Sequence, residues 1–396
     1  MRKTVLTLLA ALLLPAALPG AALSQSPEQG GFITRMGSDT LAVERFTRSG
    51  GQLEGEVVSL VPMARTVKYK ATLNPDATIS RFEVTGEPAE PSASGLRTSA
   101  EVRFVGDSVE TVATRGDSTQ RFSLAVGPGA LPILPFTYAM YEQLLLRLAH
   151  SGRDSISVAT IAPGTRQPFG FTVVRRGAQT VDVDFVPVPG FYPGGQPAHV
   201  RVDGQGRLLA LDGSDSPLKV MVERVNDVDI SAYRRQFAAR EKAKGPMGQL
   251  SSRDTLRVKV GKANLTVDYG RPQRRGREIF GNVVPWNQIW RLGANAATGF
   301  TTDADLLMGG VAIPKGSYTL FMLPSPEGGK LILNSQTGQW GTMYDPRQDF
   351  ARVDLTSEQL SQTVEPFTIA IEPRGDGGVL RLRWDRTQFS VPFTVR

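Results

Sequence analysis

Short stretches in which apolar and polar residues alternate recur along most of this chain, and they restrict its fold more than any other feature. In residues 256–260, apolar side chains at every second position alternate with Arg257 and Lys259, and the alternation resumes in residues 265–269 after a short turn. Successive side chains of a strand point to opposite faces of a sheet, so this pattern predicts a β-hairpin with one buried face. The same pattern occurs in residues 180–186, 318–323, 367–371 and 380–384. Because 41 glycines and 27 prolines supply the turns that many short strands need, we expect a mainly β protein built from antiparallel strands.

Two segments have a helical pattern instead. Residues 136–150 are apolar, contain a run of leucines and follow a proline-rich stretch, which predicts a buried helix. Residues 230–244 are highly charged and are followed by Gly245 and Pro246, a pair that is typical of a helix stop. We therefore expect a charged helix there, and a linker after it.

The charged helix marks the expected boundary between two domains. The N-terminal domain, residues 27–244, is predicted to be a curved antiparallel sheet around one buried helix, a shape that could shelter an apolar ligand. Residues 245–251 are the predicted linker, and residues 252–396 are predicted to form an antiparallel β-sandwich with one short helix. We expect that short helix to begin at Pro285, because proline is favoured in the first turn of a helix, and to end at Gly293.

Residues 1–24 have the pattern of a secretory signal peptide. Arg2 and Lys3 precede an apolar stretch, and small residues predict cleavage between Ser24 and Gln25. The alternative is a membrane anchor, but prolines interrupt the stretch and a span needs about 20 apolar residues. We therefore expect an exported protein, periplasmic or extracellular, that has no transmembrane span and is soluble once the signal peptide is removed.

Composition excludes several classes of site. The chain has no cysteine, which excludes thiol nucleophiles, thiolate metal sites and disulfides. Its formal charge of +7 is modest and no nucleic-acid-binding motif accompanies it, so no nucleic-acid partner is expected. Both histidines, His150 and His199, precede the C-terminal domain, which excludes a serine–histidine–aspartate triad and a histidine metal site within that domain. We assign no catalytic residue, no metal and no cofactor, and the sequence does not indicate an oligomeric state.

Residues 268–295 concentrate the side chains that recognition sites favour. This segment contains five arginines and two tryptophans with little regular periodicity. Guanidinium groups bind carboxylate and phosphate bidentately, and indole faces stack on sugar rings and cations. A second aromatic loop follows at residues 340–344, and the two loops would line one cleft if both lie at the same end of the sandwich. The candidate ligand-binding residues are Arg271, Arg277, Glu278, Trp290, Arg291, Asn295, Trp340 and Tyr344.

The C-terminal domain also contains six motifs in a fixed order. They are DYGRP at 268–272, GREIFG at 276–281, WRLGAN at 290–295, IPKGSYTLFMLP at 313–324, QWG at 339–341 followed by Tyr344, and RLRWDRTQFSVPF at 381–393. In these motifs the domain resembles the bacterial family catalogued as domain of unknown function 2911. That family usually carries an acidic residue where this chain has Ala296, so no role that rests on that carboxylate is expected here. The resemblance implies an exported or envelope-associated bacterial protein, and it implies no activity because the family has none assigned.

These observations leave three interpretations of the arginine- and tryptophan-containing segment. The first is a non-catalytic binding module for a small anionic or sugar-like ligand or for a protein partner of the envelope. The second is a carboxylate-dependent hydrolase acting in the C-terminal cleft, for which Glu278, Asp345 and Asp349 are the nearest carboxylates. In the third the segment only packs: Arg291 and Glu278 form a buried ion pair, and an Arg291→Ala variant unfolds. Arg274 and Arg275 are expected to be a solvated turn in each case.

Overall fold

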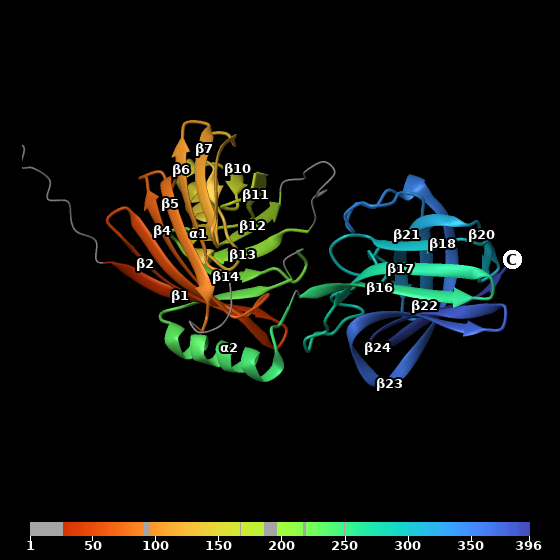
Figure 1. Cartoon of the computed structure of the whole chain (residues 1–396). Helices are drawn as coiled ribbons and strands as arrows, with labels where there is room; N and C mark the ends of the chain where they lie inside the picture. Colours follow the sequence, from red (N-terminus) through yellow and green to blue (C-terminus); the bar gives the residue numbers. More distant parts are fainter. Residues whose placement is uncertain (1–26, 91–95, 167, 186–195, 217–218, 249) are drawn as a thin grey trace, which may run out of the picture.

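The computed structural model describes residues 27–396 apart from residues 91–95, 167, 186–195, 217–218 and 249. The predicted signal peptide and its cleavage site between Ser24 and Gln25 lie outside the described residues. Figure 1 shows two β-rich bodies side by side, the first coloured red to green and the second green to blue. We call residues 27–244 the N-terminal domain and residues 252–396 the C-terminal domain, and this division stays a prediction. Among the described helices, none is both long enough and apolar enough to cross a membrane.

Fifteen strands of the N-terminal domain form one sheet. In chain order they are β1 (Glu28–Met36), β2 (Asp39–Ser49), β3 (Gln52–Ser59), β4 (Arg65–Leu73), β5 (Ile79–Pro88), β6 (Thr98–Val105), β7 (Ser108–Arg115), β8 (Ser118–Ala125), β9 (Leu131–Pro132), β10 (Ser155–Ile161), β11 (Phe169–Arg175), β12 (Thr180–Phe185), β13 (Ala198–Val202), β14 (Leu208–Asp212) and β15 (Met221–Val225). The order across the sheet runs from β8 down to β1, then from β15 down to β9, so the first and last strands pair at its middle. The pairing of β9 with β10 is parallel, and that of β1 with each of its neighbours is antiparallel.

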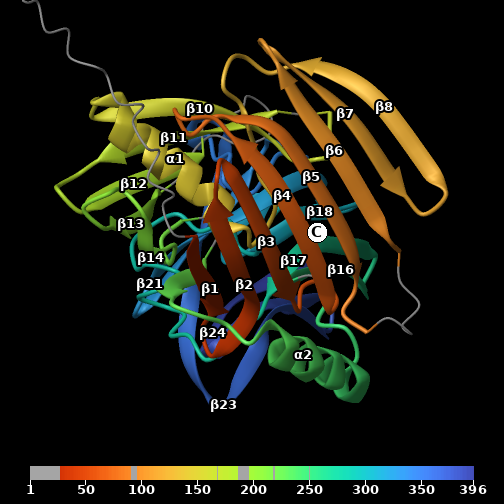
Figure 2. The same cartoon turned by 90° about the vertical axis from the view of Figure 1, so that its left-hand side faces the viewer.

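The two arms of this sheet curve around helix α1 (Tyr138–Ser151), as Figures 1 and 2 show. Met140 and Leu144 of α1 are fully buried in one cluster with Phe32 and Phe82 of the sheet. The helix ends at Gly152, whose φ of 64° lies in the left-handed region that glycine adopts most readily. The predicted curved sheet with one buried helix is therefore confirmed.

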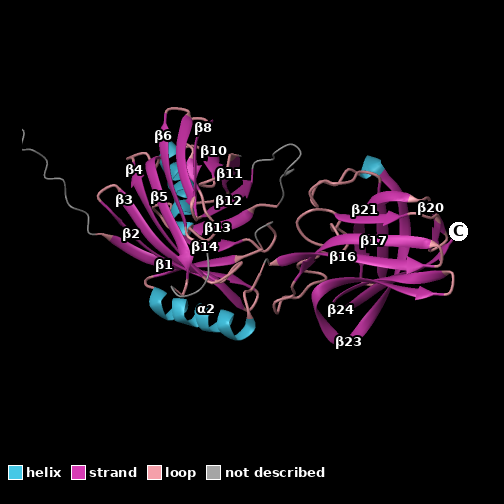
Figure 3. Cartoon of the chain, viewed as in Figure 1, coloured by secondary structure: helices cyan, strands magenta, loops and turns pink. Residues whose placement is uncertain are grey.

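Helix α2 (Ile230–Lys244) packs on the outer face of the same sheet, as Figure 3 shows in cyan. Its Ile230 and Phe237 are buried in a second cluster with Val58 of β3. The side chain of Asp229 caps the helix by accepting a hydrogen bond from the backbone N of Ala232 at 2.9 Å. The bounds of α2 are those that the sequence predicted.

Nine strands of the C-terminal domain form the second sheet, in the order β16-β17-β18-β21-β22-β23-β24-β19-β20. They are β16 (Ser251–Val260), β17 (Ala263–Pro272), β18 (Thr298–Thr302), β19 (Leu306–Met308), β20 (Val311–Ile313), β21 (Gly316–Ser325), β22 (Gly328–Asn334), β23 (Asp349–Arg374) and β24 (Gly377–Val395). The sheet folds over its own core, and the Tyr269 hydroxyl of β17 accepts a hydrogen bond from the Ile369 backbone N of β23 at 3.1 Å. Trp384, 1% exposed, lies inside the core. The mainly antiparallel β architecture of this domain is confirmed.

The predicted position of the short helix is wrong. Residues 285–290 form turns, and Trp290 instead makes an isolated antiparallel bridge with Met322 of β21. The backbone N of Asn287 donates to the Pro324 carbonyl at 2.8 Å, so tertiary bonds to β21 replace the intrahelical ones. The short helical element that the domain does contain is a single 3₁₀ turn, η1 (Pro346–Gln348).

Candidate functional site

A cavity of about 590 Å³ lies where the two domains meet. The C-terminal domain contributes the loops that follow β17 and β22, and the N-terminal domain contributes the end of β1 and the segment before β15. The lining residues from the N-terminal domain include Met36, Gln196, Asp215, Ser216 and Lys219, and those from the C-terminal domain include Arg277, Trp290, Arg291, Asn295, Thr342 and Tyr344. The C-terminal candidates therefore meet residues of the other domain, a juxtaposition that sequence reasoning did not foresee.

Five of the eight candidate residues line this cavity, namely Arg277, Trp290, Arg291, Asn295 and Tyr344. Four of them belong to the segment 268–295 and Tyr344 belongs to the loop 340–344, and these two segments lie next to each other in the fold. The backbone N of Gly341 donates to the carbonyl of Asn295 at 2.9 Å, which holds the second aromatic loop against the arginine-containing segment. The two loops therefore lie at one end of the domain, as the cleft hypothesis requires. A ligand-binding role for these residues stays a prediction.

The other three candidates lie outside the lining. Arg271 donates to the Phe367 carbonyl at 3.2 Å and to the Thr368 hydroxyl at 3.0 Å, so it braces β17 against β23. Glu278 is exposed, which contradicts the expected buried ion pair with Arg291. Trp340 makes a backbone bridge with Ala296 and does not line the cavity.

Three cationic side chains line the cavity, and each donates at least one hydrogen bond to a backbone carbonyl. Arg277 donates to the carbonyls of Arg274 at 3.0 Å and Gln273 at 2.6 Å. The Lys219 Nζ donates to the Ser214 carbonyl at 2.6 Å. Arg291, the third cation, donates from Nε to the Gly293 carbonyl at 3.4 Å.

The charge of the cavity is positive. Burial lowers the pKa of Lys219 to about 8; the carboxylate of Asp215 opposes this shift, and the positive charges of Arg291 and Arg277 add to it. Burial and the charge of Arg275 likewise lower the pKa of Arg277. Asp215 is the one carboxylate among the described lining residues, against three cationic side chains. A buried anion placed here would relieve that repulsion.

Aromatic side chains form one wall of the cavity. The Trp290 ring stacks on Trp384 with centroids 5.8 Å apart and meets Phe367 edge-on at 4.9 Å. The Tyr344 ring packs edge-on against Phe321 at 4.8 Å, and its hydroxyl donates to Asp349 at 2.6 Å. Trp290 is therefore consistent with both the binding and the packing interpretation, since it packs on the core and also lines the cavity. Both rings are held in fixed orientations.

The hydroxyl of Tyr344 is neutral at physiological pH. Burial, followed by its hydrogen bond to the Asp349 carboxylate, raises the pKa of Tyr344 to about 12. Arg352 donates to the same hydroxyl at 3.0 Å and to Asp349 at 2.7 Å. This three-residue network fixes the tyrosine ring at the cavity wall.

The carboxylates of the hydrolase alternative are engaged elsewhere. Asp345 pairs with Arg347 at 2.8 Å, Asp349 is bound by Tyr344 and Arg352, and Glu278 is exposed. None of these three carboxylates lines the cavity. Within the described parts of the chain, no group of three or more histidine or acidic side chains is arranged to hold a metal ion.

The turn that contains Arg275 joins the domains and is not simply solvated, so that expectation is wrong. The Arg275 side chain is 8% exposed and pairs with Asp39 of β2 at 2.5 Å, while the backbone N of Ser38 donates to the Arg275 carbonyl at 3.1 Å. Gly37 has a φ of 59°, and a Cβ there would lie 1.8 Å from the Arg275 carbonyl oxygen. The β1–β2 hairpin therefore fits directly against this loop.

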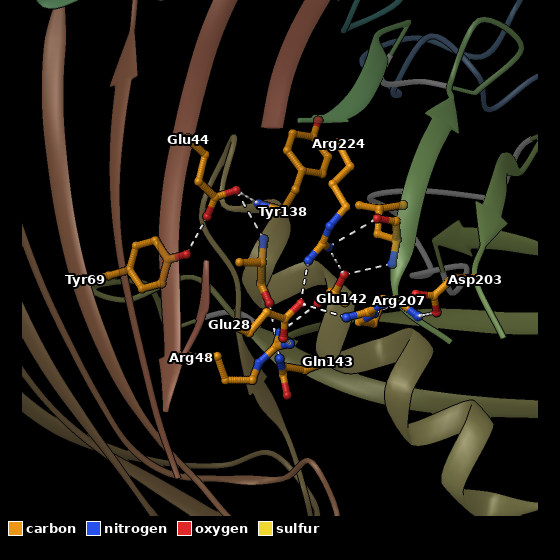
Figure 4. Close-up of polar contacts among 12 residues, drawn as sticks. Glu28, Glu44, Arg48, Tyr69, Tyr138, Glu142, Gln143, Asp203, Arg207 and Arg224 are labelled. Carbon is orange, nitrogen blue, oxygen red and sulfur yellow. Dashed lines mark hydrogen bonds and ion pairs between the residues drawn. The ribbon is translucent and has the colours of Figure 1, made fainter. Parts of the chain in front are cut away.

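A second polar cluster, inside the N-terminal domain, was also missed (Figure 4). Glu142 of α1, 0% exposed, pairs with Arg48 and with Arg224, each at 2.7 Å. Glu44 of β2 accepts hydrogen bonds from the Tyr69 hydroxyl and from the first backbone N atoms of α1. Burial raises the pKa of Glu44 to about 8. These contacts attach α1 to the strands around it, which is a structural role.

No curated protein matches the chain. A solved structure of a DUF1089 family protein from Pseudomonas aeruginosa is 18% identical, with a TM-score of 0.31, over 45% of this chain and 92% of that one. A β-barrel-like protein of the DUF1849 domain from Brucella abortus is 12% identical, with a TM-score of 0.34, over 52% of this chain and 97% of that one. The six motifs lie within residues 251–393, and these residues of the C-terminal domain match the family model described as protein of unknown function (DUF2911).

Proposed function

We propose that this protein is an exported binding protein that holds a small organic anion in the cavity between its two domains. The observation that carries the proposal is the convergence of Lys219, Arg277 and Arg291 on a cavity whose described lining includes one carboxylate, that of Asp215. Guanidinium and ammonium groups that are partly buried and close together are costly unless an anion joins them. The signal-peptide pattern of residues 1–24 supports export.

The shape of the cavity supports a small ligand rather than a protein partner. A volume of about 590 Å³ is within the range typical of small-molecule sites. The Trp290 and Tyr344 rings offer an apolar or planar group a wall beside the cationic groups. A carboxylate or phosphate attached to a small carbon skeleton would place its charge against the cationic groups and its carbon atoms against the aromatic rings. The hydrolase alternative receives no support from the carboxylate positions.

The test is thermal-shift screening of the full mature chain, because both domains contribute to the cavity. The panel contains phosphate, small mono- and dicarboxylates, sugar phosphates and the corresponding neutral sugars. A ligand at a hundredfold excess over its dissociation constant stabilises the folded state by about 2.7 kcal/mol. We expect a rise in melting temperature of roughly 3 to 5 °C with one class of anion and none with its neutral counterpart.

Two variants and a matched control locate the site. Arg277→Gln and Lys219→Gln each remove one cation from the cavity, and Lys259→Gln removes an exposed cation on β16. We expect the anion-dependent shift to fall in the first two variants and to persist in the control. An equal shift in all three proteins, or no shift with any anion, would refute the proposal.

A further inference from the structure

Lys219 has a setting that distinguishes it from the exposed lysines of the chain. Its φ of 52° lies in the left-handed region, which residues other than glycine seldom adopt. Its Nζ bonds the Ser214 carbonyl at 2.6 Å, so backbone and side chain are both fixed at the cavity wall. Such a constrained conformation at the wall of a cavity suggests a role for the amine beyond charge.

The groups that face Lys219 favour its neutral form. Arg277 and Arg291 line the same cavity, and their two positive charges repel a third on Lys219. The carboxylate of Asp215 favours the charged form of Lys219, but burial outweighs this effect. With a pKa of about 8, an appreciable fraction of the side chain is a free amine near neutral pH. Desolvation beside other cations is a recognised way to make a lysine nucleophilic.

We propose that Lys219 forms an imine with a small carbonyl compound that also carries an anionic group, a 2-oxo acid in its simplest form. This inference rests on the proposed anion site, because Arg277 and Arg291 would hold the carboxylate while the amine meets the neighbouring carbonyl carbon. Holding both groups in one cavity makes the addition effectively intramolecular.

The step needs no oxidant, reductant or cofactor. The lone pair of the neutral Nζ attacks the carbonyl carbon, a C–N bond forms, and the carbonyl oxygen takes up a proton. The resulting carbinolamine loses water, which carries away that oxygen, and leaves a C=N bond between Lys219 and the ligand. Water reverses the reaction, so the imine releases the ligand unchanged. In the Lys219→Arg variant the positive charge stays but the nucleophilic amine is lost.

The experiment traps the imine in the full mature chain. The protein is incubated with pyruvate and sodium cyanoborohydride near neutral pH, and peptide mapping by mass spectrometry locates the reduced adduct. Because a pKa about 2.5 units below the ordinary lysine value increases the free amine roughly 300-fold near neutral pH, we expect at least about tenfold more adduct at Lys219 than at the exposed Lys259. The adduct should disappear in Lys219→Arg and remain at full yield in Lys259→Arg.

Two further reagents separate this inference from the proposed function. Acetone has the carbonyl without the anion, and lactate has the anion without the carbonyl. We expect little adduct with acetone, and we expect lactate to slow trapping by pyruvate. An anion-dependent thermal shift without adduct at Lys219 would overturn the imine and leave the anion site standing. Adduct spread evenly over exposed lysines would also overturn it, and absence of both shift and adduct would overturn both proposals.

Discussion

Glu44 allows a test of the energetics of the N-terminal domain, because its carboxyl is fully enclosed and is bound by three donors. One oxygen accepts hydrogen bonds from the backbone N atoms of Tyr138 at 2.5 Å and Ala139 at 3.1 Å, and the other meets the hydroxyl of Tyr69. Thr137, the residue at the N-cap position of α1, makes no side-chain cap. Glu44 therefore caps α1 from a neighbouring strand.

The perturbation is Glu44→Gln, which keeps the shape and removes the titration. The amide oxygen can accept the two backbone bonds, and the amide nitrogen can donate to the Tyr69 hydroxyl. Burial raises the pKa of Glu44 from 4.5 to about 8, so between those values the folded protein binds a proton that the unfolded chain has lost. Stability from this group is therefore full below pH 4.5 and falls as the pH rises through 8.

The size of the Glu44 pKa shift determines how strongly the free energy of unfolding depends on pH. About 3.5 pKa units correspond to a decrease of up to about 5 kcal/mol in the free energy of unfolding between pH 4.5 and pH 8. The Gln variant lacks this decrease, so the difference between the two proteins cancels the other titrating groups. We expect Glu44→Gln to become the more stable protein as the pH rises from 5 to 9. Glu44→Ala leaves three buried donors unsatisfied and should be destabilised at every pH, by about 1 to 3 kcal/mol for each donor.

The assay is denaturant unfolding followed by circular dichroism at several pH values. The four tryptophans all lie in the C-terminal domain, so tryptophan fluorescence in the same samples reports the unfolding of that domain separately. A wild-type minus Glu44→Gln difference that stays constant from pH 5 to pH 9 would refute the reasoning, because it would mean that Glu44 is ionised in the folded protein throughout.

Three further predictions concern the cavity and the contact between the domains. In Gly341→Ala the new Cβ would lie 2.7 Å from Arg291 Cδ and 2.7 Å from the Asn295 carbonyl oxygen, so we expect anion affinity to fall by roughly tenfold, measured by calorimetry. A Gly341→Ala protein that binds as tightly as wild type would contradict this geometry. Arg275→Ala removes the pair with Asp39 and should loosen the contact between the domains, seen as a larger radius of gyration by solution scattering; an unchanged radius would count against that contact. Tyr344→Phe keeps the ring but loses the bonds to Asp349 and Arg352, and we expect a stability loss of about 1 kcal/mol with anion binding retained; lost binding would show that the hydroxyl contacts the ligand.

The strands and helices that depend on local pattern could be predicted from the sequence. The alternation in residues 256–269 predicted the β16–β17 hairpin, and the charged run that ends before Gly245 predicted the bounds of α2. The helix expected to begin at Pro285 does not form, because Asn287 adopts a φ of 60° and its backbone N bonds to β21. Those partners lie in a distant strand, so no local pattern reveals them.

The candidate site could be predicted only where its residues cluster in one stretch of sequence. Arg277, Trp290 and Arg291 lie close together along the chain, whereas Lys219 and Asp215 belong to the other domain and carry no motif. For one of the buried carboxyl groups, the sequence does contain a recognisable pattern. Glu44 shares its strand face with apolar neighbours two positions away on either side, and such a residue must find partners when that face is buried.

The central claim is that the cavity between the domains binds a small anion through cations of both domains. The most direct measurement is isothermal titration calorimetry of the full mature chain with the anion that gives the largest thermal shift, repeated with Lys219→Gln, Arg277→Gln and Lys259→Gln. We predict one binding site per chain, weakened at least about tenfold in each cavity variant and unchanged in the Lys259 control, since a charge-assisted hydrogen bond contributes about 1.5 to 3 kcal/mol. Equal affinity in all four proteins, or no heat of binding with any anion, would contradict the account.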